Sequence, residues 1–224
     1  MRASVLWTGG KDSALALYKA SLAGHEIVNL LTFAPRSAVF LAHPISFMKY
    51  QAEAMGISHV KVITDPPLED GYESAIRSFK EKYKIGALIT GDISQVDSMP
   101  NWVRQRCAGT SIDVLTPLWG MERSGLFKEL ISLRFKVIIS CVKLGSLGGE
   151  WLGRELDDDA LEDLKKIHAK TGLDICGENG EYHTMVLDGP LFRKTLSVGG
   201  YSKHETDSVM YIKPKDITLV AKVI

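Results

Sequence analysis

Residues 3–13, Ala3-Ser4-Val5-Leu6-Trp7-Thr8-Gly9-Gly10-Lys11-Asp12-Ser13, decide the fold of this chain. Apolar residues dominate its first half, 3–7, which predicts a buried strand. Two adjacent glycines follow, and a helical pattern then extends from about residue 12 to 23. Gly24 stands where a helix C-cap is expected. The sequence therefore predicts a strand, a tight glycine loop and a helix in direct succession.

The glycine loop, residues 8–13, has the composition of a phosphate site. Glycines let successive backbone N–H groups approach an anion because no Cβ intervenes. The helix N-terminus behind the loop adds partial positive charge, and Lys11 adds a full one. The P-loop of NTPases separates its glycines by a variable stretch, whereas here they are adjacent. We therefore predict a tight cup suited to pyrophosphate, in which ATP is bound by Thr8, Gly9, Gly10, Lys11, Asp12 and Ser13.

Strand and helix patterns alternate along much of the chain outside this loop. The expected strands are 27–33, 60–63, 87–90, 114–115 and 137–142, and the expected helices are about 46–55, 72–83, 100–108 and the region of 126–131. Alternation of this kind is typical of β-α-β units, so we expect an α/β fold with a parallel, Rossmann-like sheet. We assign 137–142 as the last strand of that sheet.

The glycine-rich stretch 145–149 interrupts the alternation, and we interpret it as a change of architecture rather than a linker. Beyond it, the acids at 157–159 begin a helix that Gly172 ends. Strand patterns return at 182–187 and 217–224. The sequence thus predicts an ATP-binding domain over 1–144 and a smaller α+β, substrate-binding lobe over 145–224.

The composition narrows the classes of partner. The 224 residues are 45% apolar and 24% charged, and 27 basic residues balance 27 acidic ones. This balance lacks the basic footprint of a protein that binds nucleic acid through phosphates, so we do not expect a nucleic-acid partner. We find neither a membrane-spanning run nor room for a signal peptide before the glycine loop, which predicts a cytoplasmic protein without a membrane partner. Three cysteines without paired spacing, Cys107, Cys141 and Cys176, are expected to be reduced structural thiols.

A second polar cluster follows the expected strand 87–90. Gly91 and Asp92 stand at its carboxyl end, and in open parallel sheets ligands bind at that edge. Asp92 should therefore face the same crevice as the glycine loop. It could hold Mg²⁺ against phosphates together with Asp12, or bind substrate, and the alternative is a simple helix N-cap.

A third cluster, residues 177–184, reads Gly-Glu-Asn-Gly-Glu-Tyr-His-Thr. Two acids, a histidine and a hydroxyl gather around two glycines just before an expected strand. By composition alone the stretch is either a hairpin turn or a site. His183 within it, and His43 elsewhere, are candidates for proton transfer, although an isolated histidine is more often a hydrogen-bonded structural residue.

Taken together, these motifs resemble a known family. The glycine loop resembles the PP-loop of the N-type ATP pyrophosphatases, with Thr8 retaining the hydroxyl of the usual serine. The 177–184 segment, Gly-Asp-Ile at 91–93 and Trp-Leu-Gly-Arg-Glu-Leu-Asp at 151–157 resemble the diphthine ammonia ligase (diphthamide synthase) family of that superfamily. Stretches 117–119 and 188–192 resemble it as well. The resemblance implies an adenine nucleotide alpha hydrolase-like fold.

What the resemblance implies about activity is ATP-dependent amide formation. In that family ATP adenylates the carboxylate of diphthine, a modified histidine on translation elongation factor 2. Pyrophosphate leaves in the loop, and ammonia then displaces AMP to give diphthamide. ATP, Mg²⁺, ammonium and elongation factor 2 are the expected ligands and partners, and the sequence also allows a homodimer.

The site residues carried over fall into overlapping sets. Lys11, Asp92, Glu178 and Glu181 are the expected catalytic residues, and Gly91 joins the glycine loop in binding the nucleotide. Asp12 and Asp92 are expected to hold Mg²⁺. The two glutamates could bind ammonium, remove its proton or face the trimethylammonium group of diphthine, and these roles stay open. The expected substrate-binding residues are Glu178, Asn179, Gly180, Glu181, His183 and Thr184.

Two departures bear on the acceptor. The family often has His-x-Pro-Asn where this chain has Leu-Ala-His-Pro at 41–44. It also favours an arginine and acidic residues on the helix after Gly-Asp-Ile, where this chain has Asn101, Arg104, Gln105 and Arg106. Adenylation of a different acceptor, such as a tRNA base, is therefore one alternative, and an ATP-binding sensor without turnover is another. The neutral charge and unpaired cysteines disfavour the first alternative. A complete pyrophosphate cup would be superfluous for the second.

Overall fold

A computed structural model describes residues 1–64, 68–95 and 101–222 of the chain. Its contacts separate two units, which are interleaved in sequence. The first unit comprises Met1–Thr8, Asp12–Val39 and Ile57–Gly120, and the second comprises Gly9–Lys11, Phe40–Gly56 and Met121–Ile224. The glycine loop therefore contributes its ends to the first unit and its middle to the second.

The first unit contains the predicted parallel sheet, which confirms the Rossmann-like α/β fold. Its strands are ordered β3-β2-β1-β4-β5, and each neighbouring pair is parallel. The order reverses between β1 and β4, which makes the carboxyl ends of these two strands the topological switch point. The bounds are β1 (Arg2–Leu6), β2 (Glu26–Ala34), β3 (Ser58–Ile63), β4 (Ala87–Ile89) and β5 (Asp113–Leu115).

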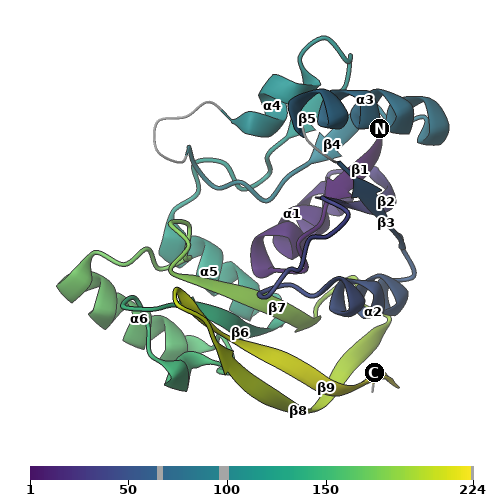
Figure 1. Ribbon diagram of the computed structural model, residues 1–224. Helices are drawn as coiled ribbons and strands as arrows, with labels where there is room; N and C mark the ends of the chain where they lie inside the picture. The colour runs from purple at the N-terminus through teal and green to yellow at the C-terminus, as the bar shows by residue number, and fades with distance from the viewer. Residues whose placement is uncertain (65–67, 96–100, 223–224) are drawn as a thin grey trace. The chain divides into compact units, whose positions relative to one another are not determined.

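Helices cover both faces of this sheet (Figure 1). The helices α3 (Leu68–Tyr83) and α4 (Trp102–Cys107) lie side by side on one face, and α1 (Lys11–Leu22) lies on the other. Beneath α3 and α4 the core joins apolar residues of both helices to β2 and β4, among them Leu31, Ile76, Leu88 and Cys107. Asn101 caps α4 by accepting the Arg104 N–H. Pro100, the expected first residue of this helix, lies outside the described residues.

The second unit is built on an antiparallel sheet ordered β7-β6-β9-β8. Its strands are β6 (Lys136–Lys143), β7 (Tyr182–Asp188), β8 (Lys194–Glu205) and β9 (Val209–Ala221). The assignment of 137–142 to the parallel sheet was wrong, because β6 pairs antiparallel with β7 and β9. Residues 137–142 are all buried, and a strand covered on both faces reads as one apolar run whatever the direction of its neighbours.

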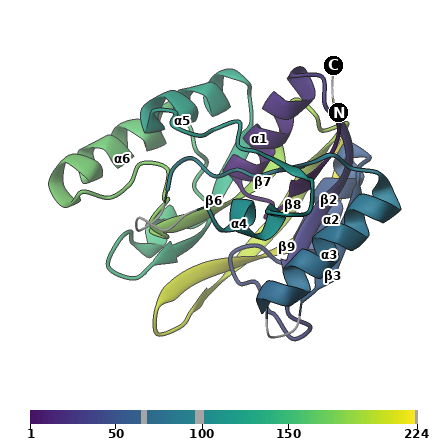
Figure 2. The ribbon, with the colours of Figure 1, turned by 90° about the horizontal axis from the view of Figure 1, so that it is seen from above.

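Four helical segments complete the second unit. They are α2 (Ile45–Met55), α5 (Arg123–Ser132), the short 3₁₀ helix η1 (Gly149–Trp151) and α6 (Asp158–Thr171). The helices α5 and α6 lie side by side (Figure 2), and α2 contacts β8 and β9. The predicted glycine stops are confirmed, since Gly56 and Gly172 adopt left-handed conformations after α2 and α6. The division at 144 and 145 stays a prediction about domain organisation.

Candidate functional site

The ends of the glycine loop, in the first unit, lie against the carboxyl end of β4. The hydroxyl groups of Thr8 and Ser13 are 3.2 Å apart and bond to each other. A Cβ placed on Gly91 would lie 2.7 Å from the Asp12 carbonyl carbon and 2.8 Å from the Ser13 nitrogen. Only glycine fits there without a backbone shift. Gly91 therefore lets the start of α1 and the end of β4 meet at the switch point.

Asp92 is held in place by two neighbours. Its Oδ2 accepts hydrogen bonds from Thr90 Oγ1 at 2.7 Å and from Asn101 Nδ2 at 2.6 Å. Within residues 1–64, 68–95 and 101–222, Oδ1 has no hydrogen-bond partner, and the residue is half-buried. The alternative of a helix N-cap is not observed, since Asn101 caps α4. Asp92 thus presents one oriented carboxylate oxygen.

The carboxylates of Asp92 and Asp12 fit a Mg²⁺ site only if phosphate oxygens complete the coordination. The described residues contain no group of three or more His, Cys, Asp or Glu side chains that could enclose a metal ion. Mg²⁺ in nucleotide sites is commonly held by one or two carboxylates together with phosphate oxygens and water. The Oδ1 of Asp92, next to the Gly91 contact with Asp12, matches that arrangement.

The middle of the glycine loop, in the second unit, runs along the open edge of β7. The Val186 N–H donates to the Gly9 carbonyl at 3.1 Å. The Gln51 side chain bridges the two segments, because its Nε2 donates to both the Gly9 and the Val186 carbonyls at 2.8 Å. Gln51 was not among the residues predicted for the site. The sequence signal for it is a polar residue at helical spacing from the apolar Phe47, Met48 and Met55.

Lys11 points into the second unit. Its side chain is only 3% exposed, and its Nζ donates to the Cys176 carbonyl at 2.5 Å. The backbone N–H of Lys11 donates to Thr184 Oγ1 at 3.0 Å. That hydroxyl therefore caps one of the amides that begin α1. The charge expected to face phosphates is directed at a protein carbonyl.

Residues 174–181, termed the acidic loop, are organised around Glu181. This buried carboxylate accepts the Asp174 N–H at 2.8 Å and the Asn179 side chain at 3.1 Å through Oε1. Its other oxygen accepts the Asn179 N–H at 3.0 Å. The Tyr182 hydroxyl donates to the Ile175 carbonyl at 2.5 Å. Both oxygens of Glu181 thus bond to the loop that contains it.

Arg123 fixes the beginning of the acidic loop from α5. Its Nε donates to Asp174 Oδ2 at 3.0 Å, while Asp174 Oδ1 accepts the Cys176 N–H at 2.7 Å. Burial alone would raise the pKa of Asp174, but the hydrogen bonds from Arg123 and Cys176 outweigh burial and lower it. Glu178, half-buried on the same loop, lies within the electrostatic field of Arg123.

His43 and His183 form a pair beside Gly10. Their rings are 5.3 Å apart at 80°, and a Cβ on Gly10 would lie 3.3 Å from His43 Cε1. Burial, His183 and the Lys11 charge together lower the pKa of His43 to about 3, against a hydrogen bond to the Thr184 backbone. In the described part of the chain, His43 Nδ1 is buried without a hydrogen-bond partner. His43 is thus neutral at physiological pH and poorly suited to act as a base.

Two of the three cysteines, Cys107 and Cys141, are poorly suited to act as nucleophiles. All three are reduced and buried. Burial raises the pKa values of Cys107 and Cys141 to about 11, and thiols so shifted are poorly ionised near neutral pH. The Cys176 thiol donates to the Arg123 carbonyl. These positions support the prediction of structural thiols.

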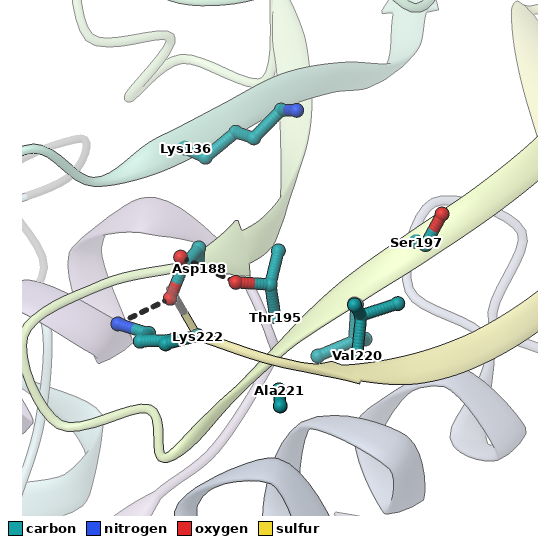
Figure 3. A pocket seen from close by; sticks show the side chains of 8 residues that line it. Lys136, Asp188, Thr195, Ser197, Val220, Ala221 and Lys222 are labelled. Atoms are coloured by element: carbon teal, nitrogen blue, oxygen red, sulfur yellow. Dashed lines mark hydrogen bonds and ion pairs between the residues drawn. The ribbon is translucent and has the colours of Figure 1, made fainter. Parts of the chain in front are cut away.

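An open pocket of about 400 Å³ lies elsewhere in the second unit, between the ends of β7 and β9 and the start of β8 (Figure 3). Asp188 lies on it, accepts the Thr195 hydroxyl at 2.7 Å and pairs with Lys222 Nζ at 2.7 Å. These contacts tie the ends of three strands together. None of the predicted site residues lines this pocket, and its acid already has a cationic partner.

The sequence matches the signatures of two protein domains and is similar to several named proteins. The signature of the diphthamide synthase N-terminal domain matches residues 1–112, and that of the diphthamide synthase C-terminal domain matches residues 122–218. A diphthine–ammonia ligase from Bos taurus is 30% identical over 257 residues, covering 100% of this chain and 94% of that protein. The Danio rerio diphthine–ammonia ligase is 30% identical over 225 residues, covering 88% and 86%.

A solved structure also aligns with the chain. It is described as a predicted subunit of a tRNA methyltransferase from Methanocaldococcus jannaschii, with a TM-score of 0.49 and 16% identity over 84% of this chain and 98% of that one. Among the described residues, no helix is both long and apolar enough to cross a membrane.

Proposed function

From the premise that the chain belongs to the diphthamide synthase family, whose two domain signatures cover most of it, we propose that it is an ATP-dependent diphthine–ammonia ligase acting on translation elongation factor 2. Relatives named diphthine–ammonia ligase that align along the whole chain support this proposal. The glycine loop, Asp92 and the acidic loop supply residue types that the reaction requires.

The proposed reaction has two steps. A carboxylate oxygen of diphthine attacks the α-phosphorus of ATP, the bond to the β-phosphate bridge breaks, and pyrophosphate leaves. The nitrogen of ammonia then attacks the activated acyl carbon, AMP leaves with the bridging oxygen, and one proton from nitrogen passes to a base. Diphthamide, AMP and pyrophosphate are the products.

The loop amides and Ser13 are the proposed ligands of the departing pyrophosphate. Glycine at two successive positions leaves the backbone accessible, and the N-terminus of α1 favours negative charge. Asp92, with Asp12, would hold Mg²⁺, which would supply positive charge to the phosphates. Such fixed charges stabilise a leaving group without reorganisation during the reaction.

Glu178 is the proposed ligand for ammonium. Both glutamates of the acidic loop are of the right type, but both oxygens of Glu181 already accept hydrogen bonds within the loop. Glu178 is half-buried and lies within the electrostatic field of Arg123. A carboxylate in this setting attracts ammonium and can take its proton as ammonia reacts.

One observation supports joint use of ATP and ammonia above the others. Gly9–Lys11 and the segment from Cys176 to Val186 are bonded together within the second unit, through Lys11 to Cys176 and Thr184 and through Gly9 to Val186. A phosphate-binding loop attached to an acidic loop suits an enzyme that cleaves ATP and also binds ammonium, the source of the ammonia nucleophile.

The test is reconstitution with ATP, Mg²⁺, ammonium and elongation factor 2 carrying diphthine. We expect AMP in a one-to-one ratio with modified acceptor, whose mass should change by replacement of a hydroxyl with an amino group. Production of ADP would refute adenylation. AMP formation that requires tRNA in place of the elongation factor would identify a different acceptor. The matched control is elongation factor 2 that lacks the diphthine modification.

A further inference from the structure

We propose that Lys11 is a positioning residue that fastens the acidic loop to the glycine loop, rather than a ligand of the ATP phosphates. The inference rests on the proposed function in assigning phosphates to the one loop and ammonium to the other. It changes the role of the one full positive charge in the glycine loop.

The Lys11 ammonium group points toward the acidic loop. Its Nζ donates at 2.5 Å to the carbonyl of Cys176, which lies 165 residues away in the chain. The side chain is almost wholly buried, and its Nζ lies 5.7 Å from the centre of the Tyr182 ring. The charge of Lys11 is therefore directed toward the carbonyl and the aromatic ring of one segment, residues 176–182.

Lys11 is held both by its main chain and by its side chain. Its backbone N–H donates to Thr184 Oγ1, so the main chain is fixed to β7 while the side chain reaches the acidic loop. The Lys11 charge also contributes to the lowered pKa of His43 in the same unit. A lysine so placed acts as a brace between two segments of one unit.

Lys11 holds the part of the acidic loop that leads to Glu178. Cys176 stands between Asp174, which is fixed by Arg123, and Glu178, the proposed ammonium ligand. Cys176 is therefore fixed through two groups, because its N–H bonds to Asp174 and its carbonyl bonds to Lys11. The segment that leads from Cys176 to Glu178 thus begins at a fixed residue. Loss of the attachment should therefore loosen the position of Glu178 and impair ammonium use more than ATP binding.

The test compares Lys11→Met with Lys215→Met, which removes the charge of an exposed lysine on β9. In the full-length protein without nucleotide, we expect Lys11→Met to raise amide hydrogen exchange across residues 174–181 by about tenfold or more, since a charge-assisted hydrogen bond is lost. MgATP affinity, measured by calorimetry, should fall by less than about tenfold. Lys215→Met should change neither quantity.

Two outcomes overturn the proposal, namely unchanged exchange in the acidic loop or a loss of MgATP affinity greater than about tenfold. Neither measurement needs turnover, so failure of the brace is distinct from failure of the proposed ligase activity. If Lys11→Met does not fold, Lys11→Gln provides the second test. It removes the charge that bonds to the Cys176 carbonyl while keeping a polar side chain, and it should raise exchange in the same loop with MgATP affinity retained.

If the reconstituted ligase is active, its kinetics add a third measurement. Lys11→Met should raise the KM for ammonium by about tenfold or more while the KM for ATP changes by less than about threefold. A rise confined to the KM for ATP would overturn the proposal.

Discussion

The Glu181 carboxylate accepts the backbone N–H of Asp174 at 2.8 Å, so the last residue of the acidic loop closes on the first. Its second oxygen accepts the N–H of Asn179. A carboxylate that accepts hydrogen bonds through both oxygens is suited to hold a turn together. We therefore predict different roles for the two glutamates of the motif. Glu181 stabilises the loop, whereas Glu178 binds ammonium.

The Glu181→Gln substitution should destabilise the protein. The glutamine amide keeps one acceptor oxygen, but its NH₂ group would replace the oxygen that accepts the Asn179 N–H. Two donors would then face each other. We expect a loss of about 1–3 kcal/mol in the free energy of unfolding, measured by urea denaturation. Glu205→Gln, at an exposed position on β8, is the control and should have little effect. Unchanged stability in Glu181→Gln would contradict the assigned role.

The Glu178→Gln substitution should affect the use of ammonium more than the binding of MgATP. Removing the charge weakens attraction for ammonium, so the KM for ammonium should rise by about tenfold or more while MgATP affinity stays within about threefold. Wild-type ammonium kinetics in this variant would remove Glu178 from the proposed mechanism.

Local sequence signals predicted several elements well. The strand-loop-helix around Thr8–Ser13 and the glycine that ends α2 depend on neighbouring residues, which a single sequence displays. Strand β8 was missed because its residues alternate between exposed and partly buried positions and form no apolar run. Strand β6 was found, but its partners are set by long-range pairing that local composition does not encode.

The site shows the same division between local and distant information. The glycine loop and the acids at 177–184 are visible as motifs. The bond between Lys11 and Cys176 joins residues far apart in sequence, and no local sequence pattern predicts it. Charge alone suggested that Lys11 would face phosphate, since a cation beside glycines usually does. Its contacts with Cys176 and Tyr182, which only the fold determines, direct it elsewhere.

The Gly91→Ala substitution should disturb the glycine loop from the side of β4. The added methyl would lie 2.7 Å from the Asp12 carbonyl carbon, and backbone atoms cannot move aside cheaply. We expect a loss of about 1–3 kcal/mol in the free energy of unfolding, together with weaker MgATP binding by calorimetry. Gly200→Ala on β8 is the control, because an added Cβ there meets nothing within 4 Å. Retained MgATP affinity in Gly91→Ala would show that the contact is not needed for nucleotide binding.

The pH dependence of stability should carry the signature of His43. Its pKa is about 3 in the folded protein against an ordinary value of 6.5. As pH falls through 6.5, the unfolded chain takes up a proton at this position that the folded protein does not, so stability declines until pH approaches 3. The decline attributable to His43 is on the order of a few kcal/mol. His43→Gln cannot take up this proton and should show a shallower decline between these limits.

The comparison of slopes isolates His43 from the carboxylates. Asp174, whose pKa is lowered, also reduces stability in acid, but it does so equally in the wild type and the variant. The free energy of unfolding should be measured by urea denaturation at several pH values between 6.5 and 4, for the wild type and for His43→Gln. Parallel curves for wild type and His43→Gln would mean that the folded protein accommodates a charged His43, and that the Lys11 charge and the burial around Gly10 oppose it less than their geometry indicates.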